Sequence, residues 1–302
     1  GVGTVDTGGA SSYWNIGHCF RFERSMAELL KGFGGHSVFF LHDVIPLTHP
    51  GMQRPSSHAH FARFVDWIGR FDGQVLVSSK ATAQSLKELG DGHATKLAAK
   101  IGPPLVVPLA VESRFLGRAS AGERSAEAPH FLFVGTLEPR KNFELLMAVW
   151  EGMLADGGPV PKLIWVGQFG WSADRAWVRR LRKLEAAGVA EWRTGVSDEA
   201  LQGLMSGARA LLFPSLVEGW GLPLSEALAM GLPVLASDIP VFREVGQGVP
   251  ELLPPHDPDS WTGAIAEYAE PESARRAAQL QRQQDYRPTT WEDHFGSLSF
   301  GV

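Results

Sequence analysis

Short apolar runs alternate with stretches of helical periodicity along most of the chain, a pattern typical of repeated strand–helix units. In the second half, strands are predicted near residues 131–134, 163–166, 190–193, 210–213, 234–236 and 251–253. Helices are predicted near residues 142–154, 173–187, 198–205, 223–230 and 259–268. This alternation favours an α/β fold with parallel sheets.

The first half of the chain shows the same alternation with fewer units. Strands are predicted near residues 37–41, 74–78 and 105–108. Helices are predicted near residues 22–31, 59–70 and 82–89. The chain is therefore expected to form two α/β domains, which its length of 302 residues permits.

A small, polar and charged segment, RASAGERSAEAP at residues 118–129, separates the two halves and is predicted to be a linker. We place the N-terminal domain at residues 1–117 and the C-terminal domain at residues 130–272. The tail at 273–302 is expected to end in a helix capped by Thr290.

Composition excludes several classes of protein. The chain is 44% hydrophobic and 20% charged with a net charge of −5, and it has no basic run that could follow a nucleic acid. Its single cysteine, Cys19, cannot form an internal disulfide, which is compatible with a reducing compartment. No apolar run reaches the length of a transmembrane helix, and the first residues do not resemble a signal peptide. We expect a cytoplasmic protein.

The segment FPSLVEGWGLPLSEALAMGLPVLASD, residues 213–238, predicts a strand, a glycine-bearing loop, a helix and a second strand. Pro223 favours the first helical position, and Gly231 favours the helix end. Glu226 is predicted in the first helical turn, where the free amides of residues 224–226 are expected to attract an anion such as a phosphate. Glu218 and Glu226 can accept hydrogen bonds from sugar hydroxyls, although Glu226 can equally complement the helix dipole.

A second segment, HFLFVGTLEPRKNFELLMAVW at residues 130–150, predicts a strand, a turn at Gly135, a polar loop and a helix. Arg140 and Lys141 lie where this helix begins. Two cations oppose the helix dipole there, so an anion is expected between them and the amides. The alternative is that both are solvated surface charges.

A third segment, SVFFLHDVIPLTHP at residues 37–50, predicts a strand that ends at His42 and Asp43. A histidine at the carboxyl end of a strand in an open α/β sheet points into the crevice where ligands bind. His42 is therefore a candidate ligand-binding residue, with a purely structural role as the alternative.

The spacing E-x7-E of Glu218 and Glu226, with EALAMGLPV following, resembles the glutamate pair of the retaining glycosyltransferases of family 4, which have the GT-B fold of two Rossmann-like domains. The resemblance covers residues 37–265 and is strongest at 213–244. It implies that Glu218 lies near the donor sugar and that Glu226 holds the ribose of the nucleotide. It also implies that the helix in the tail at 273–302 crosses back to the N-terminal domain.

The resemblance extends to the loop after Gly135. In the family, an arginine follows this glycine directly and a lysine follows five positions later, and both bind the diphosphate. Lys141 matches the lysine, whereas Thr136 occupies the arginine position, so the arginine's part passes to Arg140 or is absent. The sequence EPRKN resembles the corresponding loop in a subgroup that includes many bacterial mannosyl- and rhamnosyl-type transferases. A family histidine that contacts the donor sugar corresponds to His42.

The resemblance implies transfer of a hexose from a GDP- or UDP-linked donor to a glycan or lipid-linked acceptor, with retention of configuration. It implies a front-face reaction without cofactor or metal, and the inner membrane face as an alternative location. The sequence Asp257-Pro-Asp259 is formally D-x-D, but it is predicted to be a turn and helix cap. The implied catalytic residues are His42, Arg140, Lys141 and Glu218. The implied donor-binding residues are Gly135, Thr136, Arg140, Lys141, Glu218, Gly219, Gly221, Leu222 and Glu226.

Compared with the family, the chain has few residues ahead of Asp43, so the N-terminal domain is expected to be incomplete. Gly8 and Gly9 are expected to form a turn rather than the family's glycine-rich loop. This leaves open a non-catalytic nucleotide-sugar-binding subunit that needs a partner chain. A GT-B phosphorylase or epimerase is another alternative, whereas a nicotinamide oxidoreductase is disfavoured because no G-x-G-x-x-G follows a strand.

Overall fold

A computed structural model describes residues 4–6, 11–17, 35–69, 73–89, 103–117, 129–171 and 175–298. Gly8, Gly9, Cys19, the predicted helix at 22–31 and nearly all of the predicted linker lie outside the described residues. The chain divides into two compact units. Unit 1 comprises Gly1–Leu109 and His294–Val302, and unit 2 comprises Ala110–Asp293.

Unit 1 contains a five-stranded sheet in the order β1(Thr4–Asp6), β2(Ser11–Asn15), β3(His36–Leu41), β4(Gly73–Val77) and β5(Leu105–Val106). The first pair is antiparallel and the remaining pairs are parallel. Its helices include α2(Ile45–Thr48), α3(Ser57–Ile68) and α4(Lys80–Glu88). β1 and β2 were not predicted because their short sequences, TVD and SSYWN, carry no apolar alternation.

Both faces of the unit 1 sheet carry apolar side chains. Phe39 packs edge-on against Trp67 of α3 at a ring separation of 5.6 Å. On the other face, buried Phe40 stacks near His294 at 6.3 Å. His294 belongs to α13(Trp291–Gly296), which begins directly after Thr290 as predicted, and Thr290 Oγ1 accepts the N–H of Asp293 at 3.2 Å.

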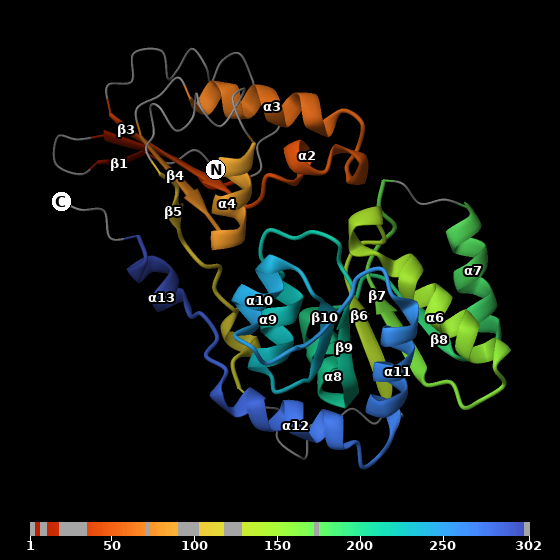
Figure 1. Ribbon diagram of the computed structural model, residues 1–302. Coiled ribbons are helices and arrows are strands. Elements are labelled where there is room, and N and C mark those ends of the chain that lie inside the picture. The colour runs from red at the N-terminus through yellow and green to blue at the C-terminus, as the bar shows by residue number, and fades with distance from the viewer. Residues whose placement is uncertain are drawn as a thin grey trace. The chain divides into compact units, whose positions relative to one another are not determined.

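Unit 2 contains a six-stranded parallel sheet, with all six predicted strands confirmed (Figure 1). In spatial order they are β8(Ala190–Arg193), β7(Lys162–Val166), β6(His130–Val134), β9(Ala208–Phe213), β10(Val234–Ser237) and β11(Glu251–Leu253). The helices are α6(Phe143–Ala155), α7(Arg175–Ala186), α8(Asp198–Gly207), α9(Leu222–Ala229), α10(Pro240–Gly246), α11(Pro258–Ala269) and α12(Ala274–Arg282). Fully buried Trp150, Trp165 and Trp261 fill the core.

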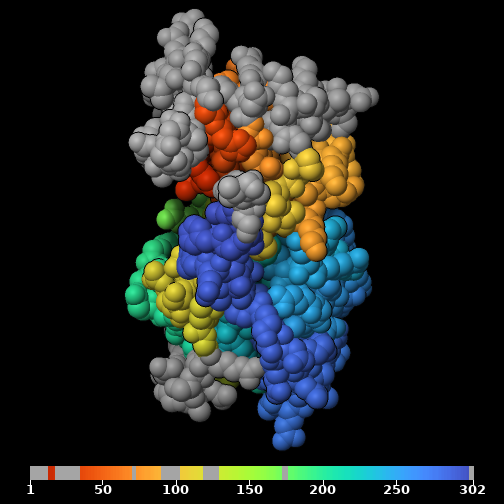
Figure 2. Space-filling model, turned by 90° about the vertical axis from the view of Figure 1, so that its left-hand side faces the viewer, coloured from red at the N-terminus to blue at the C-terminus, as the bar shows by residue number. Residues whose placement is uncertain are grey.

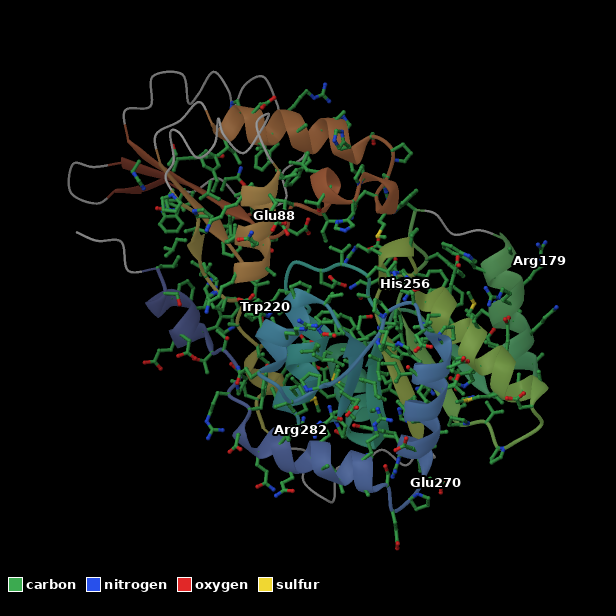
Figure 3. All side chains as sticks on the ribbon, viewed as in Figure 1. Glu88, Arg179, Trp220, His256, Glu270 and Arg282 are labelled. Carbon is green, nitrogen blue, oxygen red and sulfur yellow. The ribbon has the colours of Figure 1, made fainter. Side chains whose placement is uncertain are left out.

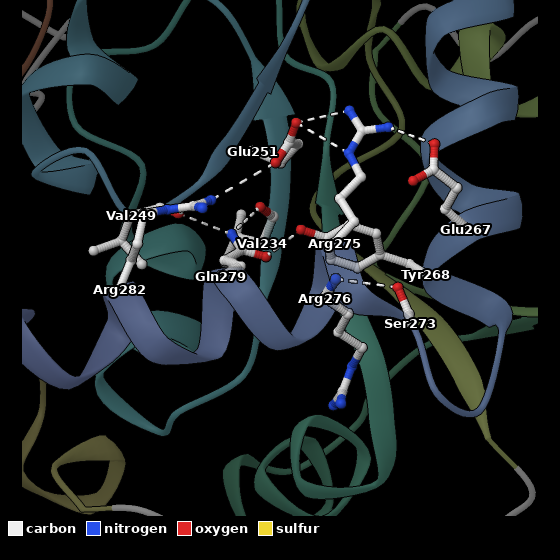
Figure 4. A network of polar contacts seen from close by, with 10 residues as sticks. All are labelled: Val234, Val249, Glu251, Glu267, Tyr268, Ser273, Arg275, Arg276, Gln279 and Arg282. Atoms are coloured by element: carbon white, nitrogen blue, oxygen red, sulfur yellow. Dashed lines mark hydrogen bonds and ion pairs between the residues drawn. The ribbon is translucent and has the colours of Figure 1, made fainter.

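Helix α12 was not predicted, because polar rather than apolar contacts hold it to unit 2 (Figure 4). In the space-filling view of Figure 2 it belongs to the blue part of the surface. Gln279 is completely buried, and its side-chain amide donates to the carbonyl oxygens of Val234 at 2.7 Å and Val249 at 3.2 Å. The Tyr268 hydroxyl donates to Gln279 Oε1 at 2.8 Å. Arg275 pairs with Glu251 of β11 at 2.7 Å. The sequence ARRAAQLQR therefore lacks the apolar stripe by which a packed helix is normally recognised.

The strand order of unit 2 has a functional consequence. The chain starts at β6 in the middle, adds β7 and β8 on one side, and then returns to add β9, β10 and β11 on the other. The topological switch point therefore lies between β6 and β9. In open parallel sheets, ligands bind outside the carboxyl ends of the strands at such a point.

No helix in the described ranges has the length and apolar character needed to cross a membrane.

Candidate functional site

The loops after β6 and β9, residues 135–142 and 214–221, meet at the switch point of unit 2. Their strands are paired, and the N–H of Leu216 donates to the carbonyl oxygen of Arg140 at 2.8 Å. Trp220, in the second loop, marks this end of unit 2 in Figure 3. The two sequence segments singled out for their charged residues are therefore held side by side.

Two glycines let the first loop pass close to the end of β7. Gly135 and Gly167 have φ angles of 156° and 154°, which side chains rarely allow. A Cβ atom on Gly167 would lie 2.0 Å from the carbonyl oxygen of Gly135. Gly167 thus permits the backbone at the end of β7 to lie close to the backbone of the loop after β6.

Arg140, Lys141 and Glu218 form one cluster of charges. Arg140 Nη1 lies 2.7 Å from Glu218 Oε2, and Lys141 Nζ donates to Glu218 Oε1. The hydroxyl of Ser215, which is fully buried, donates to the same Oε1 at 2.9 Å. Both oxygens of the carboxylate are therefore engaged, each by a different cation.

Burial makes this cluster electrostatically strong. The side chains of Lys141 and Glu218 are 9% and 8% exposed. Burial alone raises the pKa of Glu218, but the charges of Lys141 and Arg140 outweigh it and hold that pKa below its ordinary value. Glu218 is therefore ionised at neutral pH. The interpretation of both cations as solvated surface charges is wrong, since Lys141 is buried and lies 5.0 Å over the ring of Phe213.

A second carboxylate completes the cluster. Glu138 Oε1 lies 2.6 Å from Arg140 Nε, whereas Glu218 is bound through Nη1. Glu138, Arg140, Lys141 and Glu218 together carry two positive and two negative charges at pH 7. The anion expected beside the two cations is thus present in the chain itself. Sequence reasoning missed Glu138 and Ser215 as members of this cluster.

The start of α9 differs from its prediction, and this changes which backbone N–H groups are available to a ligand. Gly221, with φ of 99°, is the N-cap, and its carbonyl oxygen accepts from Leu224 at 3.0 Å and Ser225 at 3.3 Å. The expectation that the amides of residues 224–226 are free is therefore wrong, because the helix begins at Leu222. The first N–H groups of a helix have no carbonyl acceptor within that helix. Because Pro223 has no N–H, Gly221 and Leu222 supply these donors in α9.

Glu226 lies beyond the first turn of α9, and the first turn contains no acidic residue. The prediction that it lies in that turn is wrong, and complementing the helix dipole does not explain it. Burial, followed by the charges of Asp198 and Glu112, raises the pKa of Glu226 to about 7. A carboxyl group with such a pKa near a ligand-binding edge is a functional candidate.

His42 belongs to unit 1, whereas the other candidates belong to unit 2. Its Nε2 lies 2.9 Å from the carbonyl oxygen of Ile16, and its ring stacks on Phe40 at 4.5 Å. The neighbouring Asp43 accepts the N–H of Ile45 at 3.0 Å and so stabilises the start of α2. His42 is thus held in place at the end of β3, as expected from its position in the sequence.

The remaining candidates have simpler surroundings. Thr136 and Leu222 are exposed, and Gly219 is buried in the second loop. Asp257 is the N-cap of α11, where its Oδ1 accepts the N–H of Ser260 at 3.3 Å, as predicted for a turn and cap. Within the described residues no group of His, Cys, Asp and Glu side chains is arranged to hold a metal ion.

Known proteins resemble this chain along both units. The serotype-specific mannosyltransferase WbdA of Escherichia coli is 28% identical over 239 residues, which cover 76% of this chain and 29% of that protein. The O-antigen chain mannosyltransferase B of Escherichia coli is 30% identical over 162 residues, covering 54% of this chain and 42% of that protein. The chain thus spans less than half the length of these curated relatives.

Solved structures establish the fold. Sucrose-phosphate synthase from Thermosynechococcus elongatus matches with a TM-score of 0.67 at 20% identity, over 89% of this chain and 68% of that chain. Anabaena Alr3699/HepE in complex with UDP-glucose matches with a TM-score of 0.65 at 20% identity, over 85% and 69%. These likenesses confirm the predicted GT-B fold class.

The model of the family described as glycosyl transferases group 1 matches residues 120–284, which is more than half of the chain and contains the whole charged cluster. The chain belongs to this family of glycosyl transferases.

Proposed function

We propose that the protein is a glycosyltransferase that moves a hexose from a nucleotide-diphosphate sugar to a glycan or lipid-linked acceptor, with retention of configuration. The observation that carries this proposal is the buried cluster of Arg140, Lys141 and Glu218 at the switch point of a sheet with the dinucleotide-binding strand order. Membership of the glycosyl transferase family supports it.

The chemistry requires that the leaving diphosphate be neutralised. Lys141 and Arg140 supply two positive charges, and the N–H groups of Gly221 and Leu222 supply donors at the start of α9. Such preorganised groups can replace a divalent cation, so we propose a reaction that needs neither metal nor cofactor. Glu226 accepts hydrogen bonds from the ribose, and Glu218 and His42 contact the donor sugar.

Retention follows from the proposed course of the reaction. The acceptor hydroxyl approaches the face of the sugar from which the diphosphate departs. The acceptor oxygen forms the new bond to the anomeric carbon as the bond between that carbon and the diphosphate oxygen breaks. The departing diphosphate oxygen takes up the proton of the acceptor hydroxyl. No side chain needs to form a covalent intermediate.

The relatives indicate the class of donor and acceptor. One of them is named a serotype-specific mannosyltransferase and another an O-antigen chain mannosyltransferase. We therefore propose a GDP- or UDP-linked hexose of the mannose type as donor and a growing polysaccharide as acceptor. A lipid-linked acceptor would bring the protein to the inner face of the membrane as a peripheral protein.

The proposal is tested by incubating the protein with GDP- and UDP-hexoses and a mannose-containing oligosaccharide. We expect release of nucleoside diphosphate together with a product whose anomeric configuration, read by proton NMR, equals that of the donor. Lys141→Ala serves as the matched inactive variant. Tight binding of nucleotide sugar without transfer or donor hydrolysis would instead identify a non-catalytic binding subunit. Isomerisation of the sugar without transfer would indicate an epimerase, and cleavage of the oligosaccharide by inorganic phosphate would indicate a phosphorylase.

A further inference from the structure

The charged cluster has no net charge in the free protein, although the ligand it is proposed to bind is a polyanion. Glu218 contributes one negative charge against Lys141 and Arg140, and Glu138 contributes another against Arg140. A diphosphate that approaches the two cations therefore meets carboxylate oxygens already in contact with them. Without a change in these pairs, the positive charge is not available to the ligand.

We propose that Glu218 is a specificity-determining residue that opposes free diphosphates and thereby makes the site select the intact nucleotide sugar. This inference rests on the proposed function of the same site. In the free protein the Glu218 carboxylate takes the position of an anion between Lys141 and Arg140. Binding of a diphosphate displaces it from at least one of these cations.

Each cation has a second contact that does not involve Glu218. Lys141 is buried over the ring of Phe213, and the Arg140 guanidinium also pairs with Glu138. Glu218 is followed by Gly219, which has no side chain and so tolerates a wide range of backbone conformations. Displacement is therefore assigned to Glu218 rather than to the cations.

The displaced carboxylate distinguishes two ligands. In an intact nucleotide sugar it gains hydroxyl donors from the sugar, so part of the lost interaction with the cations is recovered. Free nucleoside diphosphate and inorganic pyrophosphate offer no such hydroxyl at this position, so for them the loss is not recovered. The consequence is weaker retention of the nucleoside diphosphate after the sugar has been transferred.

The test is calorimetric titration of inorganic pyrophosphate into the wild type, Glu218→Gln and the matched control Glu272→Gln, which removes an exposed negative charge of the same unit. Pyrophosphate has no base or ribose, so Glu226 does not contribute. We expect Glu218→Gln to bind pyrophosphate at least about tenfold more tightly than the wild type, and Glu272→Gln to bind it equally. One such factor corresponds to about 1.4 kcal/mol.

A second variant covers the case in which Glu218→Gln does not fold, since it leaves buried Lys141 without its carboxylate partner. Glu218→Asp keeps the charge but shortens its reach, and we expect it to bind pyrophosphate more tightly than the wild type. Pyrophosphate affinity that is unchanged or reduced in the folded variants, while nucleotide sugars still bind the wild type, overturns the inference. Absence of nucleotide-sugar binding in every form would overturn the proposed function itself.

Discussion

Replacement of Glu226 by Gln is predicted to stabilise the protein in a pH-dependent way. Burial raises the pKa of Glu226 from its ordinary 4.5 to about 7 in the folded protein. Below pH 4.5 the group is protonated in both the folded and the unfolded chain. As the pH rises through 7, the folded protein acquires a poorly solvated carboxylate beside other acidic groups, so the stabilising effect of the raised pKa is lost.

The size of this effect follows from the two pKa values. Each tenfold difference in proton affinity is worth about 1.4 kcal/mol, so ionisation of this group lowers the free energy of unfolding by at most about 3.5 kcal/mol. Because Glu226 keeps some contact with solvent, we expect Glu226→Gln to recover about 1 to 2 kcal/mol at pH 8. For a domain of this size that raises the melting temperature by roughly 3 to 6 °C.

The assay is thermal unfolding of the wild type, Glu226→Gln and the exposed control Glu272→Gln at pH 5, 6, 7 and 8. The gain of Glu226→Gln over the wild type should be small at pH 5 and largest at pH 8, with no such trend for the control. A gain that does not depend on pH, or a loss at pH 8, refutes the assignment. In the same series, nucleoside diphosphate affinity should rise with pH more in the wild type than in Glu226→Gln, because ribose hydroxyls donate to the ionised form.

Further predictions concern other parts of the two units. Gly167→Ala should destabilise the protein by about 2 kcal/mol or more in urea unfolding, because its Cβ would meet the carbonyl oxygen of Gly135, whereas Gly203→Ala, with open space around it, should not; equal effects would contradict the role of the close backbone contact. Lys141→Ala should lower the turnover number by on the order of 10² to 10³, the effect of removing one preorganised donor to a developing charge, and a turnover number within a few-fold of the wild type would remove it from this role. His42→Ala should lower turnover while the calorimetric affinity for nucleoside diphosphate stays nearly unchanged, and a parallel loss of affinity would place His42 on the nucleotide instead. Sugar transfer should continue in EDTA, and loss that is restored by Mg²⁺ or Mn²⁺ would contradict the metal-independent reaction.

The sheet of unit 2 could be predicted from the sequence because its strands are buried on both faces and form continuous apolar runs, such as FLFV at residues 131–134. Helix α12 could not, because Gln279 and Arg275 hold it through hydrogen bonds and ion pairs. Polar contacts of this kind leave no periodic signal in the sequence.

The same distinction applies to the site. Glycines, charges and helix starts in the sequence indicate the candidate residues, but the pairing of Lys141 with Glu218 joins positions 77 residues apart and depends on the neighbouring placement of β6 and β9. The raised pKa of Glu226 likewise depends first on its burial in the fold and then on Asp198 and Glu112, neither of which is near it in sequence. Glu226 itself was placed in the wrong helical turn, because the helix start at Leu222 is fixed by the backbone of Gly221.

The central claim, that Lys141 and its neighbours at the switch point bind the diphosphate of a nucleotide sugar, is tested most directly by thermal unfolding with GDP-, UDP-, ADP- and dTDP-sugars. A ligand present at 100 times its dissociation constant stabilises the folded protein by about 2.7 kcal/mol, or roughly 5 to 10 °C for a domain of this size. We predict such a shift with at least one nucleotide sugar in the wild type and its loss in Lys141→Ala. No shift with any of them, or an equal shift in both proteins, would contradict the claim.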